Sequence, residues 1–138
     1  MIGRAMLLGT ASLVLVAARP SPEAPDGLWL NPAGTVAVRV AFCGTRLCGW
    51  IAWAAPAARA DAHEAGVERL TGTELLRDYR HREPGLWTGT VYVPDMGRGF
   101  PSTIWQVRPE LLRIKGCLLD GLICRSQDWR LIDQVPHA

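Results

Sequence analysis

The chain has 138 residues, with 15 basic and 13 acidic side chains and a formal charge of +2. This near-neutral balance argues against a nucleic-acid-binding protein, which would carry a strongly basic patch or stripe. The length suits one domain rather than two.

The N-terminal segment has the pattern of a secretory signal peptide. Arg4 precedes an apolar run over residues 5–16, and small residues follow the run. The run is shorter than the roughly 20 apolar residues of a transmembrane helix, and the proline-bearing stretch 19–26 is typical of an extended spacer. We therefore expect residues 1–18 to be removed on export and a single domain to occupy residues 27–138. The alternative is a retained membrane anchor or a buried N-terminal helix.

Most of the remaining chain alternates apolar and polar residues with a period of two, as half-buried β-strands do. In residues 35–42, for example, Val36, Val38, Val40 and Phe42 share one face. Turns rich in proline and glycine separate the alternating segments. The segments predicted to be strands are residues 27–30, 35–42, 47–53, 74–79, 86–93, 100–107, 111–117 and 123–131.

Eight strands joined by short connections favour antiparallel neighbours. Such a sheet can close on itself, which removes its exposed edges. We therefore predict an all-β fold, an eight-stranded antiparallel up-and-down barrel whose interior is either filled or holds one small ligand. A two-sheet sandwich of the same strands is the alternative. The alanine-rich segment 54–70 has room for one short helix or a flap between the third and fourth strands.

The four cysteines form two pairs that each flank a predicted hairpin turn, Cys43 with Cys48 and Cys117 with Cys124. Their spacings, C-x4-C and C-x6-C, match neither a zinc-binding C-x2-C pair nor a C-x-x-C redox motif. Residues that face each other across a turn come within disulfide reach. We expect two hairpin disulfides, each contributing about 2 kcal/mol, while bridges between the two pairs also fit the sequence. We expect no metal site and no cofactor.

The sequence contains no strong candidate for a catalytic group of residues, and we expect that the protein is not an enzyme. Ser126 with Asp128, and Asp95 with Arg98, lie at turns or strand ends, where turn formation and capping explain them. A nucleophile with its base, or a pair of carboxylates in one pocket, would be needed for an active site.

Four segments carry the motifs of a known family. They are GLWL at 27–30, VRVAFCGTRLCGWIAW at 38–53, LWTGTVYVPDMGRGF at 86–100 and LRIKGCLLDGLICRSQDW at 112–129. They resemble a group of small exported bacterial proteins catalogued as domain of unknown function 2147. That family is similar to lipocalin-like, or calycin, β-barrels, so the resemblance implies a pocket but names no ligand.

The same resemblance implies a role for Trp29. The tripeptide Gly27-Leu28-Trp29 is similar to the lipocalin Gly-x-Trp element, in which the tryptophan closes one end of the barrel. In that element an arginine from the last strand packs over the indole ring, a contact of about 0.5 to 2 kcal/mol. The resemblance implies that Arg130 or Arg125 packs over the ring of Trp29 in this chain.

The six tryptophans are the main candidates for a binding surface, although we expect most of them in the core. Trp50 and Trp53 are predicted on opposite faces of one strand, so that at most one faces the interior. Trp105 and Val107 share a face in a strand that is apolar on both sides. That second apolar face would be covered by segment 54–70 or by a partner.

The sequence therefore predicts an exported carrier, periplasmic or secreted from a bacterium, that binds a small apolar or amphipathic molecule inside the barrel. The alternative is an envelope module with a filled barrel, whose outer tryptophan-bearing face contacts a protein or a glycan. In neither case do we expect a nucleic-acid partner or a membrane-spanning mature chain. The candidate cavity or barrel-end residues are Trp29, Trp87, Trp105 and Arg130.

Overall fold

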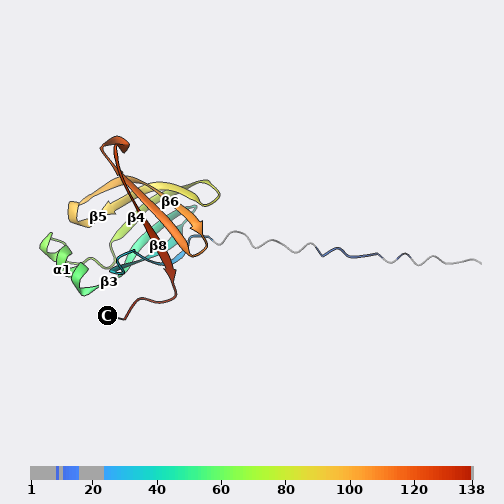
Figure 1. The fold of residues 1–138 in the computed structure, drawn as a ribbon, viewed down its shortest axis with the longest axis horizontal. Helices are drawn as coiled ribbons and strands as arrows, with labels where there is room; N and C mark the ends of the chain where they lie inside the picture. Colours follow the sequence, from blue (N-terminus) through green and yellow to red (C-terminus); the bar gives the residue numbers. More distant parts are fainter. Residues whose placement is uncertain (1–8, 10, 16–23, 138) are drawn as a thin grey trace, which may run out of the picture.

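Eight antiparallel strands close into a barrel in the computed structural model, which describes residues 9, 11–15 and 24–137 (Figure 1). Each strand pairs with its neighbours in the sequence, and the last strand returns to pair with the first. The strands are β1 (Gly27–Leu30), β2 (Val36–Cys43), β3 (Arg46–Ala54), β4 (Glu74–Glu83), β5 (Leu86–Val93), β6 (Arg98–Arg108), β7 (Leu111–Leu118) and β8 (Ile123–Ile132). The predicted up-and-down barrel is confirmed, and the sandwich is not the fold.

The connection between β3 and β4 contains helix α1 (Pro56–Glu64), which confirms a short helix in segment 54–70. Pro56 stands in the first helical turn, where its missing N–H leaves no hydrogen bond unmade. Ala62 is buried, and Ala58 packs against the barrel core. The helix therefore covers part of the barrel rather than standing apart from it.

Alternate connections lie at opposite ends of the barrel because the strands run antiparallel. One end carries α1 and two 3-10 turns, η1 (Pro94–Met96) between β5 and β6 and η2 (Leu119–Gly121) between β7 and β8. The other end carries the tight turns that follow β2, β4 and β6. We name the first the open end and the second the closed end.

The barrel interior is packed most tightly in the closed half. Its largest fully buried side chains include Trp29, Tyr79, Leu47, Ile104 and Leu112, each less than 2 % exposed. They come from five different strands and belong to one core cluster. Burial of each such side chain contributes roughly 1.5 to 3 kcal/mol, so this cluster is the main source of the barrel's stability.

A bulge turns both Trp50 and Trp53 to the outside of the barrel. The register between β2 and β3 shifts between Ala37 and Val38, which inserts one extra residue into β3 between the two tryptophans. Trp50 then faces Arg39 and Trp53 faces Ala37, two residues on the same outward face of β2. The prediction that these tryptophans lie on opposite faces is wrong, because strict alternation does not survive a bulge.

A second, smaller apolar cluster covers the outer face where the barrel closes. Its buried members are Leu28, Leu30 and Ala37, and Trp53 and Ile132 pack against them. Strand β1 has only four residues, so its pairing with β8 is short. The outer apolar packing therefore reinforces the seam between the first and last strands.

Both predicted hairpin disulfides are present. Cys43 pairs with Cys48, with Cα atoms 5.9 Å apart, and Cys117 pairs with Cys124, with Cα atoms 4.1 Å apart. All four cysteines are used. The first bridge is at the closed end, and the second lies next to the turn at the tip of the β7–β8 hairpin, which projects beyond the barrel at the open end (Figure 1).

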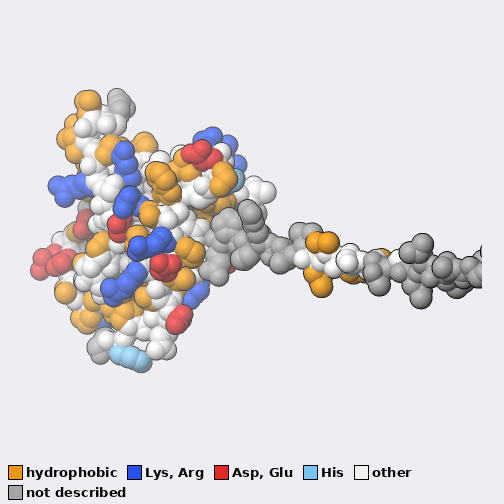
Figure 2. Space-filling model, turned by 45° about the vertical axis from the view of Figure 1, so that its right-hand side comes forward, with side chains coloured by type: hydrophobic (Ala, Val, Ile, Leu, Met, Phe, Trp, Pro, Cys, Tyr) orange, Lys and Arg blue, Asp and Glu red, His pale blue; other side chains and the backbone are white. Residues whose placement is uncertain are grey.

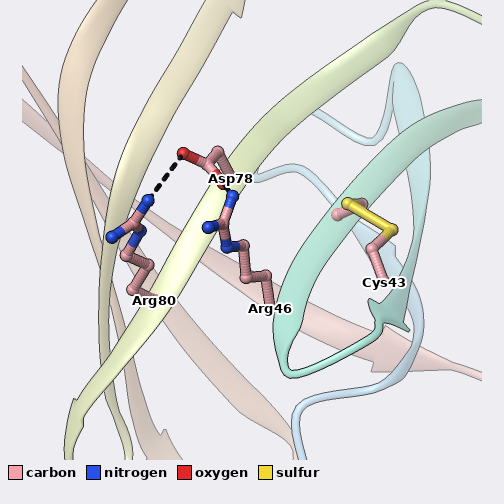
Figure 3. Close-up of polar contacts among 5 residues, drawn as sticks. Cys43, Arg46, Asp78 and Arg80 are labelled. Carbon is pink, nitrogen blue, oxygen red and sulfur yellow. Dashed lines mark hydrogen bonds and ion pairs between the residues drawn. A yellow bond between two sulfur atoms is a disulfide. The ribbon is translucent and has the colours of Figure 1, made fainter.

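An ion-pair group near the first disulfide ties β3 to β4 (Figure 3). The Asp78 carboxylate accepts a hydrogen bond from the guanidinium of Arg46 on β3 and lies 3.9 Å from the Arg80 guanidinium. Asp78 has a positive φ of 58°, at a point where the register between β4 and β5 shifts. An aspartate tolerates this conformation better than most residues, and its charge is paired there.

The predicted signal peptide, residues 1–18, and spacer lie largely outside the described residues and stay predictions. Within the described part of the chain, no helix combines the length and the hydropathy needed to cross a bilayer.

We expect a thiol titration of the oxidised, denatured protein to find no free thiol. Four titratable thiols would contradict the disulfide assignment.

Replacing Cys117 and Cys124 together by serine should lower the free energy of unfolding by about 2 kcal/mol, because the loop they close is short. Urea denaturation measures this change. The control is Ser126→Ala in the same hairpin, which should stay within about 0.5 kcal/mol of the unchanged protein.

Candidate functional site

A cavity of about 330 Å³ lies at the open end of the barrel. We name it the open-end cavity. Apolar side chains from β4 to β8 make up most of its wall, among them Leu76, Val91, Phe100, Ile114, Leu118 and Trp129. Its volume falls near the lower bound of small-molecule sites in proteins, which run from about 300 to 1,000 Å³.

The inward-facing residues of β7 become smaller toward the open end. The series runs from Leu112 and Ile114 to Gly116, which lines the cavity. A Cβ atom at Gly116 would lie 3.3 Å from Cγ1 of Val91 on β5. Val91 therefore approaches Gly116 closely, and a larger side chain at this position would have to displace Val91 or enter the cavity.

A neighbouring cavity of about 260 Å³ lies beside helix α1. Leu75, Val93, Pro94 and Trp129 line both cavities, so the two adjoin along these side chains. The rest of the apolar part of the second wall consists of Val36, Ile51, Ala58, Ala62 and Leu70. The helix therefore closes one side of the open end, and the β7–β8 hairpin borders the other.

Two polar side chains from β8, Arg125 and Gln127, also line the open-end cavity. Arg125 faces Gly116 and Gln127 faces Ile114 across the β7–β8 ladder, which places both on the inward side of the strand with Trp129. The indole Nε1 of Trp129 donates a hydrogen bond of 3.0 Å to Oε1 of Gln127. The sequence interpretation missed Gln127, although counting back from Trp129 in steps of two would have placed both residues inside.

Trp29 occupies the closed end of the barrel, 1 % exposed. Its indole Nε1 donates a 2.9 Å hydrogen bond to the carbonyl oxygen of Pro25, so the polar atom of this buried ring is satisfied. Arg130 pairs with Leu30 and points to the outer face, whereas Arg125 lines the open-end cavity. The prediction that one of them packs over Trp29 is wrong, because neither side chain projects to that part of the interior.

The other two candidate tryptophans also lie away from the open-end cavity. Trp87 is buried at the closed end against Phe42 and His81, with ring centroids 5.9 and 4.8 Å away, and borders a separate hollow there with His81. Trp105 is 58 % exposed on the outer face of β6. Contact of Trp29, Trp87, Trp105 or Arg130 with a ligand stays a prediction.

A depression of about 470 Å³ lies on the outer face of β4 to β7, and its lining is polar. Arg80, Arg82, Thr88, Thr103 and Lys115 line it. These polar side chains alternate with the inward-facing core residues and are hydrated like any strand surface. For this reason we regard the smaller apolar cavity as the stronger candidate site.

Asp128, one of the residues weighed for catalysis, is explained by an ion pair. The Arg113 guanidinium donates to both carboxylate oxygens of Asp128 across the β7–β8 ladder, at 2.8 and 3.2 Å. This hydrogen bonding to Arg113 holds the pKa of the Asp128 carboxyl below its ordinary value. A bidentate pair on the outer face positions the two strands and leaves no role for that carboxylate inside the barrel.

Two buried hydroxyls, of Tyr79 and Ser102, lie deeper in the barrel than the cavity. The Tyr79 ring lies directly over Gly89, where a Cβ atom would come within 2.7 Å of Tyr79 Cγ. Neither hydroxyl completes a hydrogen bond of normal geometry with a described atom. Burial raises the pKa of the Tyr79 phenol well above its ordinary value, and the Ser102 hydroxyl opposes this rise only in part.

The family assignment follows from a match between residues 27–130 and the family described as "Uncharacterized protein conserved in bacteria (DUF2147)". The chain belongs to this family. The matched residues span all of the barrel except the end of β8. The expected family resemblance is confirmed.

The fold is similar to that of protein HP1028 from the human pathogen Helicobacter pylori, which is described as belonging to the lipocalin family. The two structures superpose with a TM-score of 0.58 and 10 % sequence identity, over 78 % of this chain and 82 % of the other. At this identity the likeness concerns the fold alone. A comparison with curated protein sequences finds no match.

The buried phenol of Tyr79 makes a pH-dependent prediction. The native state holds a proton that the unfolded chain releases above about pH 10. The stabilising contribution of the neutral phenol is therefore fully present below about pH 10 and is lost as the pH rises above it. Tyr79→Phe should remove this alkaline loss, whereas Tyr92→Phe, on a partly exposed residue, should retain it.

Urea denaturation between pH 8 and pH 11 measures this dependence. At neutral pH we expect Tyr79→Phe to change the free energy of unfolding by less than about 1 kcal/mol, because the phenol hydroxyl makes no hydrogen bond of normal geometry with a described atom. Tyr79→Ala should cost about 3 to 5 kcal/mol through the cavity that it leaves. An unchanged alkaline loss in Tyr79→Phe would show that another group causes it.

Proposed function

We propose that the protein is an exported carrier that binds a small apolar or amphipathic molecule in the open-end cavity. The observation that carries the proposal is the contrast between the two halves of the barrel. Trp29, Tyr79 and Leu47 fill the closed half, whereas the open half contains a cavity of about 330 Å³ with mostly apolar walls. Carriage or sequestration, without turnover, is the function that such a cavity supports best.

The driving force for binding is the removal of apolar surface from water. Each methylene group of a ligand that enters the cavity contributes about 0.8 kcal/mol. The walls are largely preformed by strands of the barrel, so little conformational entropy is lost when the ligand binds. The aromatic side chains of Trp129 and Phe100 form part of the apolar wall, which suits an aliphatic chain or a small ring system.

Apolar side chains at the rim support uptake from an apolar source. Leu119 and Leu122 in the β7–β8 connection are 67 % and 84 % exposed, and Ile123 at the start of β8 is 48 % exposed. Met96 in η1, also lining the cavity, is 55 % exposed. Figure 2 shows hydrophobic side chains on the projection beyond the barrel, where a water-insoluble molecule leaving a membrane or another protein would first make contact.

Three further observations agree with export and carriage. The two cysteine pairs within bonding distance suit an oxidising compartment such as the periplasm or the extracellular space. The N-terminal sequence has the signal-peptide pattern. The similar fold of the Helicobacter pylori protein, described as a lipocalin, favours ligand binding in general, and we propose no catalytic activity.

A second candidate function is an interaction module, and the exposure of Trp105 favours it. Trp105 and Val107 are 58 % and 39 % exposed on the outer face of β6. An exposed tryptophan beside another apolar residue is a common feature of protein or glycan contact surfaces. This function uses the outside of the barrel, so it can be separated experimentally from carriage.

We expect the neutral apolar probe N-phenyl-1-naphthylamine to bind with enhanced fluorescence, and Gly116→Leu to weaken that binding at least tenfold. The leucine side chain would project into the cavity against Val91. Lys115→Leu is the matched control, because it adds the same side chain to the outer face of the same strand. Fluorescence titration measures both affinities.

Equal affinities of the Gly116→Leu variant and the unchanged protein would place the probe outside the open-end cavity and contradict the proposal. Trp105→Ala tests the alternative directly. Loss of probe binding in Trp105→Ala, with binding retained in Gly116→Leu, would favour the outer face as the binding surface.

A further inference from the structure

The open-end cavity has one polar edge, and it is formed by β8. Arg125 and Gln127 stand two residues apart on the inward side of this strand, so their Cα atoms are separated by roughly 7 Å. The guanidinium carries only hydrogen-bond donors, and it is charged at every physiological pH. A cation at the edge of an apolar cavity is a specific feature, because apolar walls alone would bind a neutral ligand.

Gln127 is oriented so that it also offers donors. Its Oε1 accepts the hydrogen bond from Trp129 Nε1, and an indole N–H can only donate, which fixes the amide orientation. The side-chain NH2 of Gln127 is therefore the group available to a ligand. Arg125 and Gln127 together present donors to the same edge of the cavity, which is the chemistry that recognises an anion.

The charges around the cavity agree with this polarity. Among the described side chains, no carboxylate lines the open-end cavity, and none lies within 4.0 Å of Arg125. Asp61 and Asp95 line the neighbouring cavity beside α1 instead. An anionic ligand would be attracted to the β8 edge and repelled from the α1 side, so only one orientation is favoured.

We propose that the ligand is an aliphatic monocarboxylate, held with its carboxylate against Arg125 and the Gln127 amide and its chain between the apolar walls. This inference rests on the proposed carrier function and names the ligand class for the same cavity. A planar carboxylate can accept two parallel hydrogen bonds from a guanidinium, an arrangement that a hydroxyl or an ester cannot reproduce. Phe100, Val91 and Ile114 contact the chain.

The size of the cavity limits the length of the chain. At about 30 Å³ for each water-sized unit of condensed matter, a volume of about 330 Å³ holds roughly 11 non-hydrogen atoms. A saturated acid of about ten carbons fits this volume. Longer chains, and larger molecules such as N-phenyl-1-naphthylamine, extend into the adjoining cavity beside α1, which shares Trp129 and Leu75 with the first.

The experiment compares decanoate with decanol by isothermal titration calorimetry, at one pH and one salt concentration. The two ligands share the same chain and differ in the charged head group. We expect decanoate to bind at least tenfold more tightly than decanol. Arg125→Gln should remove that difference by weakening decanoate binding at least tenfold, with decanol binding unchanged.

Arg130→Gln is the matched control, because Arg130 lies on the same strand but faces the outside. It should leave both affinities unchanged. Arg125→Lys, which keeps the charge without the planar fork, should retain part of the preference for decanoate. Near-UV circular dichroism of each variant verifies that the barrel packing is intact.

The outcomes separate this inference from the function on which it rests. If decanoate and decanol bind equally well and Arg125→Gln alters neither, the carboxylate site is wrong and the carrier function stands. If neither ligand binds at millimolar concentration and N-phenyl-1-naphthylamine also fails to bind, the carrier function is wrong and this inference fails with it. If Arg130→Gln has the same effect as Arg125→Gln, the preference arises from overall charge and the proposed contact is wrong.

Discussion

The barrel depends on the pairing of β1 with β8. Leu28, Trp29 and Leu30 form the ladder with residues 130–132, and this short contact joins the two ends of the sheet. A closed barrel of eight strands encloses a space just wide enough for side chains or for one small ligand. Inside the seam Trp29 fills the closed end, and outside it an apolar cluster packs over the same strands. The position of the cavity follows from this constraint, because a space filled from the closed end has room left only at the open end.

The size of the inward-facing residues then decides where that room is. Tyr79 over Gly89 fills the closed half of the barrel, and Gly116 lines the cavity nearer the mouth. Helix α1 and the β7–β8 hairpin border this space from two sides, and the disulfide from Cys117 to Cys124 links the two strands of the hairpin near its tip. A rigid strand framework with an apolar cavity at one end, beside exposed apolar side chains, agrees with the proposed binding of a ligand of limited solubility.

Much of this fold can be predicted from alternation and turns, because the strands pack one face against a common interior. The eight predicted segments match the observed strands to within a few residues, and the cysteine spacing predicts both hairpin disulfides. The errors have local physical causes. A bulge near Ala37 turns Trp50 and Trp53 to one face, and no sequence signal announces it. Counting in steps of two from Trp129 assigns Arg125 to the inner face of its strand. The sequence does not show that a cavity lies beside Arg125, because the cavity depends on how side chains from different strands meet.

The six tryptophans test directly whether a ligand binds in the open half of the barrel while the closed half stays filled by side chains. The indole N–H signals in a two-dimensional ¹⁵N–¹H spectrum, recorded during titration with N-phenyl-1-naphthylamine, report on each tryptophan separately. The account predicts a large shift for Trp129, which lines the open-end cavity, and none for Trp29 or Trp87 in the closed half. A titration that moved Trp29 and Trp87 while leaving Trp129 in place, or that moved only Trp105 on the outer face, would contradict it.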